Sequence, residues 1–374
     1  MHIRTMNTEQ FQKLKRALNG SFNMDEIIGF VKNLDKNEIK FNEIISIIQD
    51  IVIKKSNCDS VVKFASMVKE SDKNRLQQII LDSNNARSMH NFAKLVDGAD
   101  VGLLQSAIIK SGNVEYIYKF ANEIKNADVK LLESEIIRSG NSRYIYLFAN
   151  NIKCTNIELL QTAVCMNGDA EYIYKFAKFV QGADIEFLQT TICQTGDHKY
   201  MYEFALNIKE SDASYICSKV LKDDNSIYLS KFASCIKGLD VELLQSATIK
   251  SNNALIVYEF ALLVDEADVE LLQSAIIRIA DAKYIFYFAR NVKGANVSLL
   301  QDKIIESNQT EYMYEFAFRV KNANKELLKK AIRIIGGQEI IGRFNHRYDS
   351  CIEIKEEEIS NLLQSYVINE IMES

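Results

Sequence analysis

The chain has 374 residues, a formal net charge of −5 at pH 7 and a sequence pI near 5.6. This acidic balance argues against a general binder of nucleic acid or anionic membranes, because both require a basic protein surface. The chain contains no proline, where about 19 would be expected at an ordinary frequency of about 5%. Helices can therefore run through most of it without a break.

The N-terminal sequence carries no apolar core of signal-peptide length, and no apolar run approaches the roughly 18 residues that a membrane span needs. We therefore expect a cytoplasmic protein without a membrane span. Its seven cysteines form no close-paired motif, which fits reduced thiols.

Residues 1–56 predict an N-terminal cap followed by a degenerate repeat. Residues 8–18 have the pattern of a capping helix with Thr8 at its N-cap. Residues 24–33 and 37–55 resemble a repeat with a longer second helix. Terminal units of a repeat array need such a departure, because their outer faces meet water.

Residues 57–336 consist of ten tandem repeats with a period of 28 residues and no insertion or deletion. A typical unit is NVEYIYKFANEIKNADVKLLESEIIRSG, from Asn113 to Gly140. Each unit carries a Phe-Ala pair, and the phenylalanines are Phe64, Phe92, Phe120, Phe148, Phe176, Phe204, Phe232, Phe260, Phe288 and Phe316. Phe344 lies on the same grid.

Each unit predicts two short amphipathic helices, because its apolar residues recur at spacings of three and four. In the typical unit, the apolar face of the first helix comprises Tyr116, Ile117, Phe120, Ala121 and Ile124. The second helix has a wide apolar face of Val129, Leu132 and Ile136, with Leu131 and Ile137 beside them.

Two columns of Asn and Asp predict where the helices begin, since these side chains accept the free N–H groups of a first turn. One column precedes each second helix: Asp72, Asp100, Asp128, Asn156, Asp184, Asp212, Asp240, Asp268, Asn296 and Asn324. The other precedes each first helix: Asn57, Asn85, Asn113, Asn141, Asp169, Asp197, Asn225, Asn253 and Asp281, with Gln309 as the exception.

One helix pair cannot bury its apolar arc alone, so neighbouring pairs must stack. The sequence thus predicts an all-α fold: a right-handed αα superhelical solenoid of about 11 to 12 two-helix repeats. Residues 337–374 predict a degenerate repeat with a seven-residue insertion and a C-terminal cap, because the LLQS string returns at Leu362 to Ser365.

The string YIYxFAxxIKxADVxLLQxAIIxSGN resembles the αα-solenoid class of HEAT, TPR, armadillo, PPR and pumilio repeats. It is also similar to tandem repeats in uncharacterised proteins of low-GC bacteria and their phages. The 28-residue unit is shorter than the roughly 34 to 47 residues of those classes, and the TPR signature is absent. The resemblance implies a binding platform for peptides, proteins or nucleic acid and carries no catalytic residues.

A tyrosine–lysine ladder is the first candidate site. An aromatic column lies two residues before each repeat phenylalanine, and a lysine column lies five residues after it. Its members are Tyr118, Tyr146, Tyr174, Tyr202, Tyr258, Phe286 and Tyr314, with Lys125, Lys153, Lys209, Lys237, Lys293 and Lys321. Such a ladder could stack nucleobases and pair phosphates. Alternatively, each tyrosine packs on the next helix with a lysine over it.

An apolar patch is the second candidate, since large apolar residues stand at positions that are polar in most units. They are Leu147, Phe179, Leu206, Leu262, Leu263, Tyr287 and Phe318. Exposed apolar side chains on a repeat protein predict a protein-binding or self-association surface, although single ones are normal.

A glutamine column in the second helices is the third feature: Gln77, Gln105, Gln161, Gln189, Gln245, Gln273 and Gln301. The column lies between apolar positions, so we predict hydrogen bonds between stacked helices. Recognition of a partner by these amides is the alternative.

Catalytic and metal-binding patterns are missing, so we predict no enzyme and no cofactor. The histidines His2, His90, His198 and His346 share no metal-ligand spacing, and Cys165 and Cys193 predict small core residues. We expect a protein or peptide partner, with nucleic acid as the alternative, and self-association stays open. The leading hypothesis is a protein-binding scaffold.

Overall fold

A computed structural model describes residues 23–34, 36, 41–153, 155–222, 227–335 and 339–347. All the regular secondary structure in these ranges is helical, as the periodicity predicts. The predicted N-terminal cap at 8–18, the cap residue Asn225 and the C-terminal cap around 362–365 lie outside the described residues.

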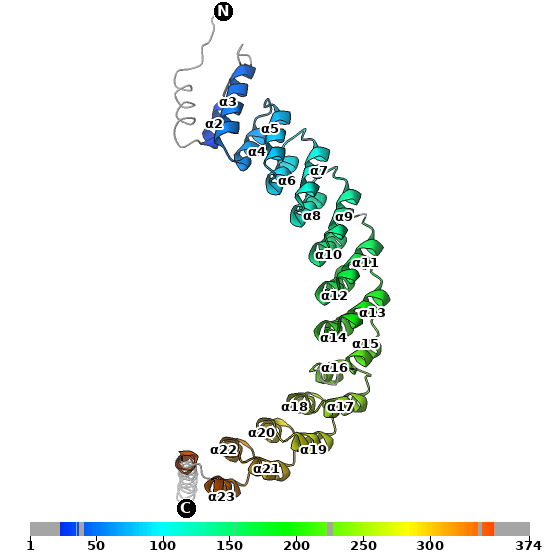
Figure 1. Cartoon of the computed structure of the whole chain (residues 1–374), viewed down its shortest axis with the longest axis vertical. Coiled ribbons are helices and arrows are strands. Elements are labelled where there is room, and N and C mark those ends of the chain that lie inside the picture. The colour runs from blue at the N-terminus through cyan, green and yellow to red at the C-terminus, as the bar shows by residue number, and fades with distance from the viewer. Residues whose placement is uncertain are drawn as a thin grey trace, which may run out of the picture. The chain divides into compact units, whose positions relative to one another are not determined.

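The helices come in pairs along the chain (Figure 1). The first helices of the pairs are α2 (Met24–Lys32), α4 (Cys58–Met67), α6 (Ala86–Leu95), α8 (Val114–Glu123), α10 (Ser142–Asn151), α12 (Ala170–Phe179), α14 (His198–Asn207), α16 (Leu229–Cys235), α18 (Ala254–Leu263), α20 (Ala282–Asn291) and α22 (Thr310–Arg319). The second helices are α3 (Phe41–Lys55), α5 (Lys73–Asp82), α7 (Val101–Ser111), α9 (Val129–Arg138), α11 (Ile157–Asn167), α13 (Ile185–Thr195), α15 (Ala213–Val220), α17 (Val241–Lys250), α19 (Val269–Ile279), α21 (Val297–Glu306) and α23 (Lys325–Ile335).

Two compact units divide the chain, Met1–Thr195 and Gly196–Ser374. In each unit taken alone, the even-numbered helices form one layer and the odd-numbered helices form the other (Figure 1). From α4 onward each first helix packs on its pair partner, and consecutive first helices of a unit pack on one another. Most second helices pack on their pair partner and on the first helix of the next pair. Each unit is therefore an all-α solenoid, in which a repeat contacts chiefly the next repeat.

Side-chain caps start the helices where the sequence predicts them. Asp100 Oδ1 accepts the N–H of Leu103 at 3.0 Å, and Asn113 Oδ1 accepts the N–H of Tyr116 at 3.3 Å. Gln309 has the same extended backbone as the other cap residues, but its side chain makes no capping bond to α22. The exception in the cap column is therefore a real gap in the local hydrogen bonding.

The second helices end in a left-handed residue at a fixed position of the repeat. Gly112 has φ of +67° there, and Asn308 has φ of +55°. Ala280 takes the same backbone region with φ of +62°, although an alanine Cβ disfavours it. The register of the array thus imposes this conformation even where the residue is unsuited to it.

The phenylalanine column forms the centre of the core. Every repeat phenylalanine from Phe64 to Phe344 is fully buried, together with Leu132 and Ile136 of the second helix in the typical unit. The periodicity also predicts Leu131 beside that buried face, and this is wrong: Leu131 is 44% exposed. At 100° per residue it turns away from Leu132, and no neighbouring repeat covers that side.

The glutamine column joins consecutive second helices, as predicted. Gln105 Oε1 accepts the backbone N–H of Asp128, the cap residue of α9, at 2.8 Å. Gln245 accepts the N–H of Asp268 in the same way at 2.7 Å. Glu133 takes this position in α9 and accepts the N–H of Asn156 at 2.7 Å. Each bond satisfies the N–H of a cap residue in the next repeat.

Near the N-terminus, α3 has 15 residues. Gln49 Oε1 accepts the N–H of Asp72 at 2.9 Å, so the glutamine bond already begins at this helix. None of the described helices is long and apolar enough to cross a membrane.

Candidate interaction surfaces

The tyrosines of the predicted ladder pair with tyrosines of the next first helix. The ring of Tyr118 lies 5.8 Å from that of Tyr144, and the ring of Tyr146 lies 6.1 Å from that of Tyr172. Unit 2 repeats this contact between Tyr258 and Tyr284 at 6.1 Å. The second ring of each pair was not among the predicted site residues, although its column is visible four residues before the phenylalanine.

Most of the ladder's rings pack against neighbouring helices rather than standing free. Tyr174, Phe286 and Tyr314 are buried, and Tyr118, Tyr146, Tyr202 and Tyr258 are half-buried. Edge and tilted contacts between such rings stabilise the stack beyond the burial of their area. The ladder is thus first a packing element between repeats.

Several tyrosine hydroxyls are bonded within the protein. Asn151 Nδ2 donates to Tyr118 Oη at 2.8 Å, and Asn291 Nδ2 donates to Tyr258 Oη at 2.8 Å. In both cases the donor lies 33 residues later, three residues after the next repeat phenylalanine. Tyr202 is paired with Cys235 in the same register: burial first, and then this hydrogen bond, raise the pKa of Tyr202 to about 12.

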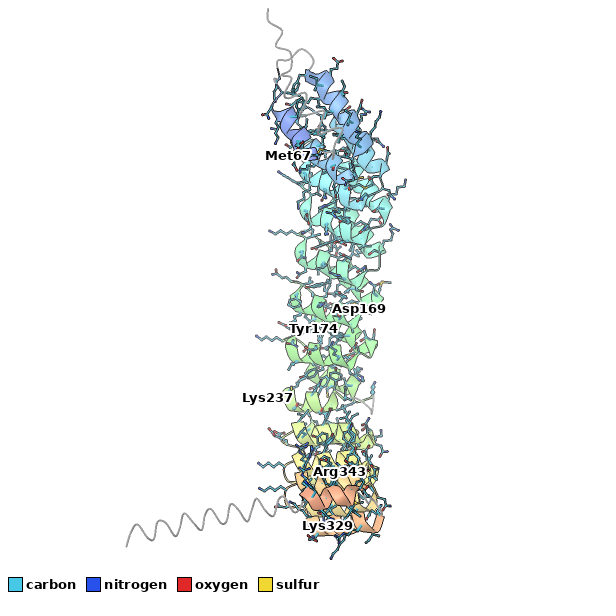
Figure 2. All side chains as sticks on the ribbon, turned by 90° about the vertical axis from the view of Figure 1, so that its left-hand side faces the viewer. Met67, Asp169, Tyr174, Lys237, Lys329 and Arg343 are labelled. Atoms are coloured by element: carbon cyan, nitrogen blue, oxygen red, sulfur yellow. The ribbon has the colours of Figure 1, made fainter. Side chains whose placement is uncertain are left out.

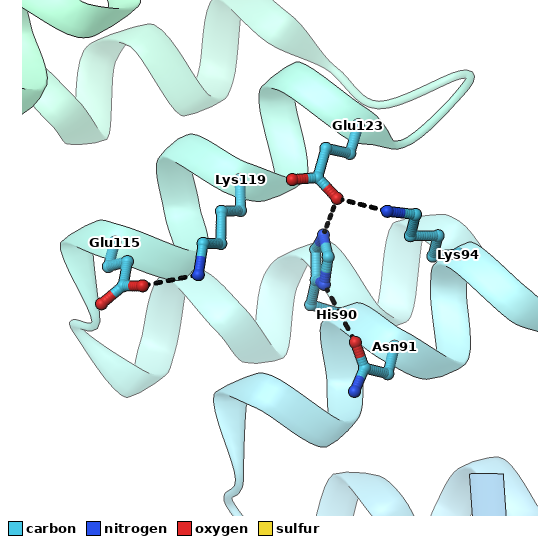
Figure 3. Close-up of polar contacts among 6 residues, drawn as sticks. All are labelled: His90, Asn91, Lys94, Glu115, Lys119 and Glu123. Carbon is cyan, nitrogen blue, oxygen red and sulfur yellow. Dashed lines mark hydrogen bonds and ion pairs between the residues drawn. The ribbon is translucent and has the colours of Figure 1, made fainter. Parts of the chain in front are cut away.

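His90 takes the ladder position two residues before Phe92, and Figure 3 shows its contacts with Glu123 and Asn91. His90 is buried, its ring lies 5.9 Å from that of Tyr116, and its Nε2 lies 3.3 Å from a carboxylate oxygen of Glu123. Lys94 Nζ holds that same oxygen at 2.7 Å. Burial lowers the pKa of His90, while Asn91 and Glu123 act in the opposite direction. His90 is therefore mainly neutral at pH 7 and fills a tyrosine's place.

The lysines of the predicted ladder lie apart from the rings. Lys125, Lys153, Lys209, Lys237, Lys293 and Lys321 are all exposed in the turns after the first helices. Figure 2 looks onto the layer of even-numbered helices. Lys237 lies at the edge of this layer, beyond the end of α16, whereas Tyr174 lies within α12. No cation–π contact joins these six lysines to a tyrosine within the described ranges.

Other lysines lie over rings of the second tyrosine column, four residues before each repeat phenylalanine. Lys119 Nζ lies 4.9 Å from the ring centre of Tyr116, and Lys231 Nζ lies 4.6 Å from that of Tyr228. These lysines directly precede a repeat phenylalanine. Their column is broken by acids, Glu203, Glu259 and Glu315 among them. These contacts therefore involve neither the lysines nor the tyrosines of the predicted ladder, and the column of these lysines has mixed charge.

The residues of the predicted apolar patch divide into two groups. Phe179, Leu206, Leu262 and Leu263 are exposed, whereas Leu147, Tyr287 and Phe318 are half-buried. Phe318 packs 4.9 Å from the ring of Phe344 and lies under Arg347 at 4.9 Å. Side chains of the first group are available to a partner, and those of the second also serve packing.

A regular column of exposed apolar residues was missed by the sequence reasoning. We call it the outer leucine column: Leu103, Leu131, Leu159 and Phe187 in unit 1, and Leu243, Leu271, Leu299 and Leu327 in unit 2. Their exposed fractions lie between 41% and 55%. The signal was present in the sequence as the first residue of each LLQ string and of the related strings LLE, FLQ and LLK, but both apolar residues of the string were expected on one apolar face.

No cluster of three or more metal-ligating side chains occurs among the described residues. Cys165 is buried, and burial raises the pKa of its thiol, in line with a small core residue. His198 lies at the start of α14 and His346 in the helical stretch 339–347. No protein-family model matches the chain, and the curated proteins contain no match to it.

Proposed function

We propose that this chain is a non-catalytic, cytoplasmic protein-binding scaffold that holds a protein or peptide partner against exposed apolar side chains of its helical repeats. The observation that carries the proposal is the outer leucine column. Eight repeats place a large apolar side chain at one position of the second helix, with roughly half of its surface in water.

Local structure gives no reason for leucine at this position. Its backbone N–H donates to the cap residue, and this bond needs no particular side chain. Arg75 occupies the position in α5 and makes the same bond to Asp72 at 3.0 Å. Single exposed apolar residues are ordinary on protein surfaces, but a recurrent column of them fits a surface that a partner covers.

Substitution of the column tests the proposal. We would compare the full chain with the double variant Leu243→Ser/Leu271→Ser in affinity capture with quantitative mass spectrometry. The matched control is Ser246→Ala/Ser274→Ala, because these exposed residues lie three positions further on the same helices. We expect partners retained by wild type and control to be lost by the leucine variant. The same proteins bound to all three chains would reject this surface.

The exposed part of the apolar patch supports the same function from the other layer. Leu206, Leu262 and Leu263 lie on α14 and α18, and each has between 44% and 47% of its surface exposed. The variant Leu262→Ser/Leu263→Ser should remove a different subset of partners if the two layers bind separately. An unchanged set of partners would assign binding to the outer leucine column alone.

Nucleic-acid binding by the tyrosine–lysine ladder is the second candidate. The contact of Lys178 with the ladder tyrosine Tyr174, at 5.2 Å from the ring centre, favours it, because a cation beside an aromatic face can serve a stacked base and its phosphate. The internal bonding of Tyr118 and the net charge of −5 weigh against it. A gel-shift assay at low salt with single-stranded and double-stranded probes tests this candidate, because the affinity of such binding falls steeply as the salt concentration rises. No retarded band at low salt would reject nucleic-acid binding by the ladder.

A further inference from the structure

Three successive helices in unit 2, α15, α16 and α17, lack contacts that hold the other repeats together. In the surrounding repeats, capped helices, the glutamine bond between second helices and a buried aliphatic residue recur in one register. The stability of a solenoid is close to a sum of such repeat and interface contributions. Neighbouring helices that lack several of these stabilising contacts should therefore unfold locally most easily.

The bond between consecutive second helices is missing here. Cys217 in α15 takes the glutamine position, and burial raises the pKa of its thiol to about 11, so it stays a neutral thiol, a weak hydrogen-bond partner. Within the described ranges, no side chain accepts the N–H of Asp240, the cap residue of α17. One repeat later, Gln245 accepts the N–H of Asp268 at 2.7 Å.

Helix α16 is short, and the described residue directly before it makes no capping bond with its side chain. It has seven residues and begins after Tyr228. By contrast, α18 has ten residues and starts at Asn253, which accepts the N–H groups of Leu255 and Ile256. Nucleation of a short helix depends on such bonds, because few internal hydrogen bonds compensate for its ordering.

The core of α17 contains a polar defect. Thr248 is fully buried, and its hydroxyl has no hydrogen-bond partner. In the following repeats the same position holds Ile276 and Ile304, which are equally buried. A buried hydroxyl without a partner loses its bond to water and gains none in return.

We propose that α15, α16 and α17 form a hinge segment, which opens as a local unit while α18 to α23 stay folded. The three departures fall on adjacent helices and act on the same repeat interfaces, so their effects accumulate there. The hinge follows from the free chain alone and does not rest on any binding partner. It gives unit 2 a point at which the row can bend or separate reversibly.

Native-state hydrogen exchange of the full chain, followed by mass spectrometry, tests the hinge. We expect peptides from α16 and α17 to exchange at least about 10-fold faster than the equivalent peptides from α18 and α19, in proportion to their local opening. Equal exchange rates in the two regions would overturn the proposal.

Two substitutions at one register position locate the cause. Thr248→Val removes the unpaired hydroxyl without changing the shape of the side chain, and should slow exchange in α16 and α17 about 10-fold. Ile304→Thr transplants the defect into α21 and should create a second fast-exchanging region there. If Thr248→Val leaves exchange unchanged while Ile304→Thr has no local effect, the register position does not control opening and the proposal fails.

Discussion

The bond from Gln105 to the next repeat can be removed by Gln105→Leu, which we expect to loosen the joint between α7 and α9. Gln105 is 4% exposed, and its Oε1 accepts the N–H of Asp128 at 2.8 Å. Leucine fills a similar volume but leaves the Asp128 N–H without an acceptor. An unpaired buried donor costs about 1–3 kcal/mol, and a loss of about 2 kcal/mol corresponds to about 30-fold easier local opening.

Urea denaturation measures the effect on the free energy of unfolding, and hydrogen exchange measures it on local opening near Asp128. The free energy of unfolding should fall by about 2 kcal/mol, and peptides that contain Asp128 should exchange faster. The control is Gln105→Glu, since Glu133 shows that a carboxylate can accept the same bond, at 2.7 Å from Asn156. If Gln105→Leu stays within about 0.5 kcal/mol of wild type and exchange at Asp128 does not change, the bond does not stabilise the joint.

Three further substitutions test single positions of the array. Ala280→Gly should raise the free energy of unfolding by about 1 kcal/mol, because φ at Ala280 is +62° and glycine adopts this left-handed backbone without a clash of Cβ. As the control, Ala107→Gly within α7 should lower the free energy of unfolding by about 1 kcal/mol, because glycine disfavours a helix interior. Gln309→Asp should add about 1 kcal/mol in urea denaturation by capping α22, whereas Gln309→Ala should change little; equal values for both variants would contradict the capping argument. His90→Tyr should flatten the pH dependence of stability. Burial lowers the pKa of His90 in the folded state, so the wild-type protein loses stability as pH falls from about 6.5 through the folded-state pKa. Thermal melts between about pH 7 and pH 5 should therefore show a smaller loss of stability for the variant than for wild type.

Much of the repeat architecture could be predicted because its causes are local. Asp100 and Asn113 start helices through bonds to N–H groups three residues ahead, so their spacing in the chain is sufficient to place those helices. The exception at Gln309 was predicted for the same reason and is confirmed. The glutamine bonds were also predicted, because a polar column between apolar ones must satisfy its hydrogen bonds inside the stack.

The candidate surfaces depended on contacts between repeats and were predicted less well. The partner of the Tyr118 hydroxyl is Asn151, 33 residues away, and no spacing within one helix points to it. A helical wheel places Lys125 near the tyrosine column, but the first helix ends at Glu123 and the turn carries Lys125 away from the rings. A wheel assumes a continuous helix, and it fails beyond the helix end.

The sequence by itself determined the period, the helix pairs, the positions of most caps and the buried phenylalanine column of this protein, because each follows from bonds and periodicity within one unit. Only the tertiary structure decided which flank of each helix a neighbour covers. Leu131 and Leu132 are adjacent leucines in one helix, yet one is 44% exposed and the other is fully buried. Burial depends on what the next repeat places against that side, and the sequence of a single unit does not contain this information.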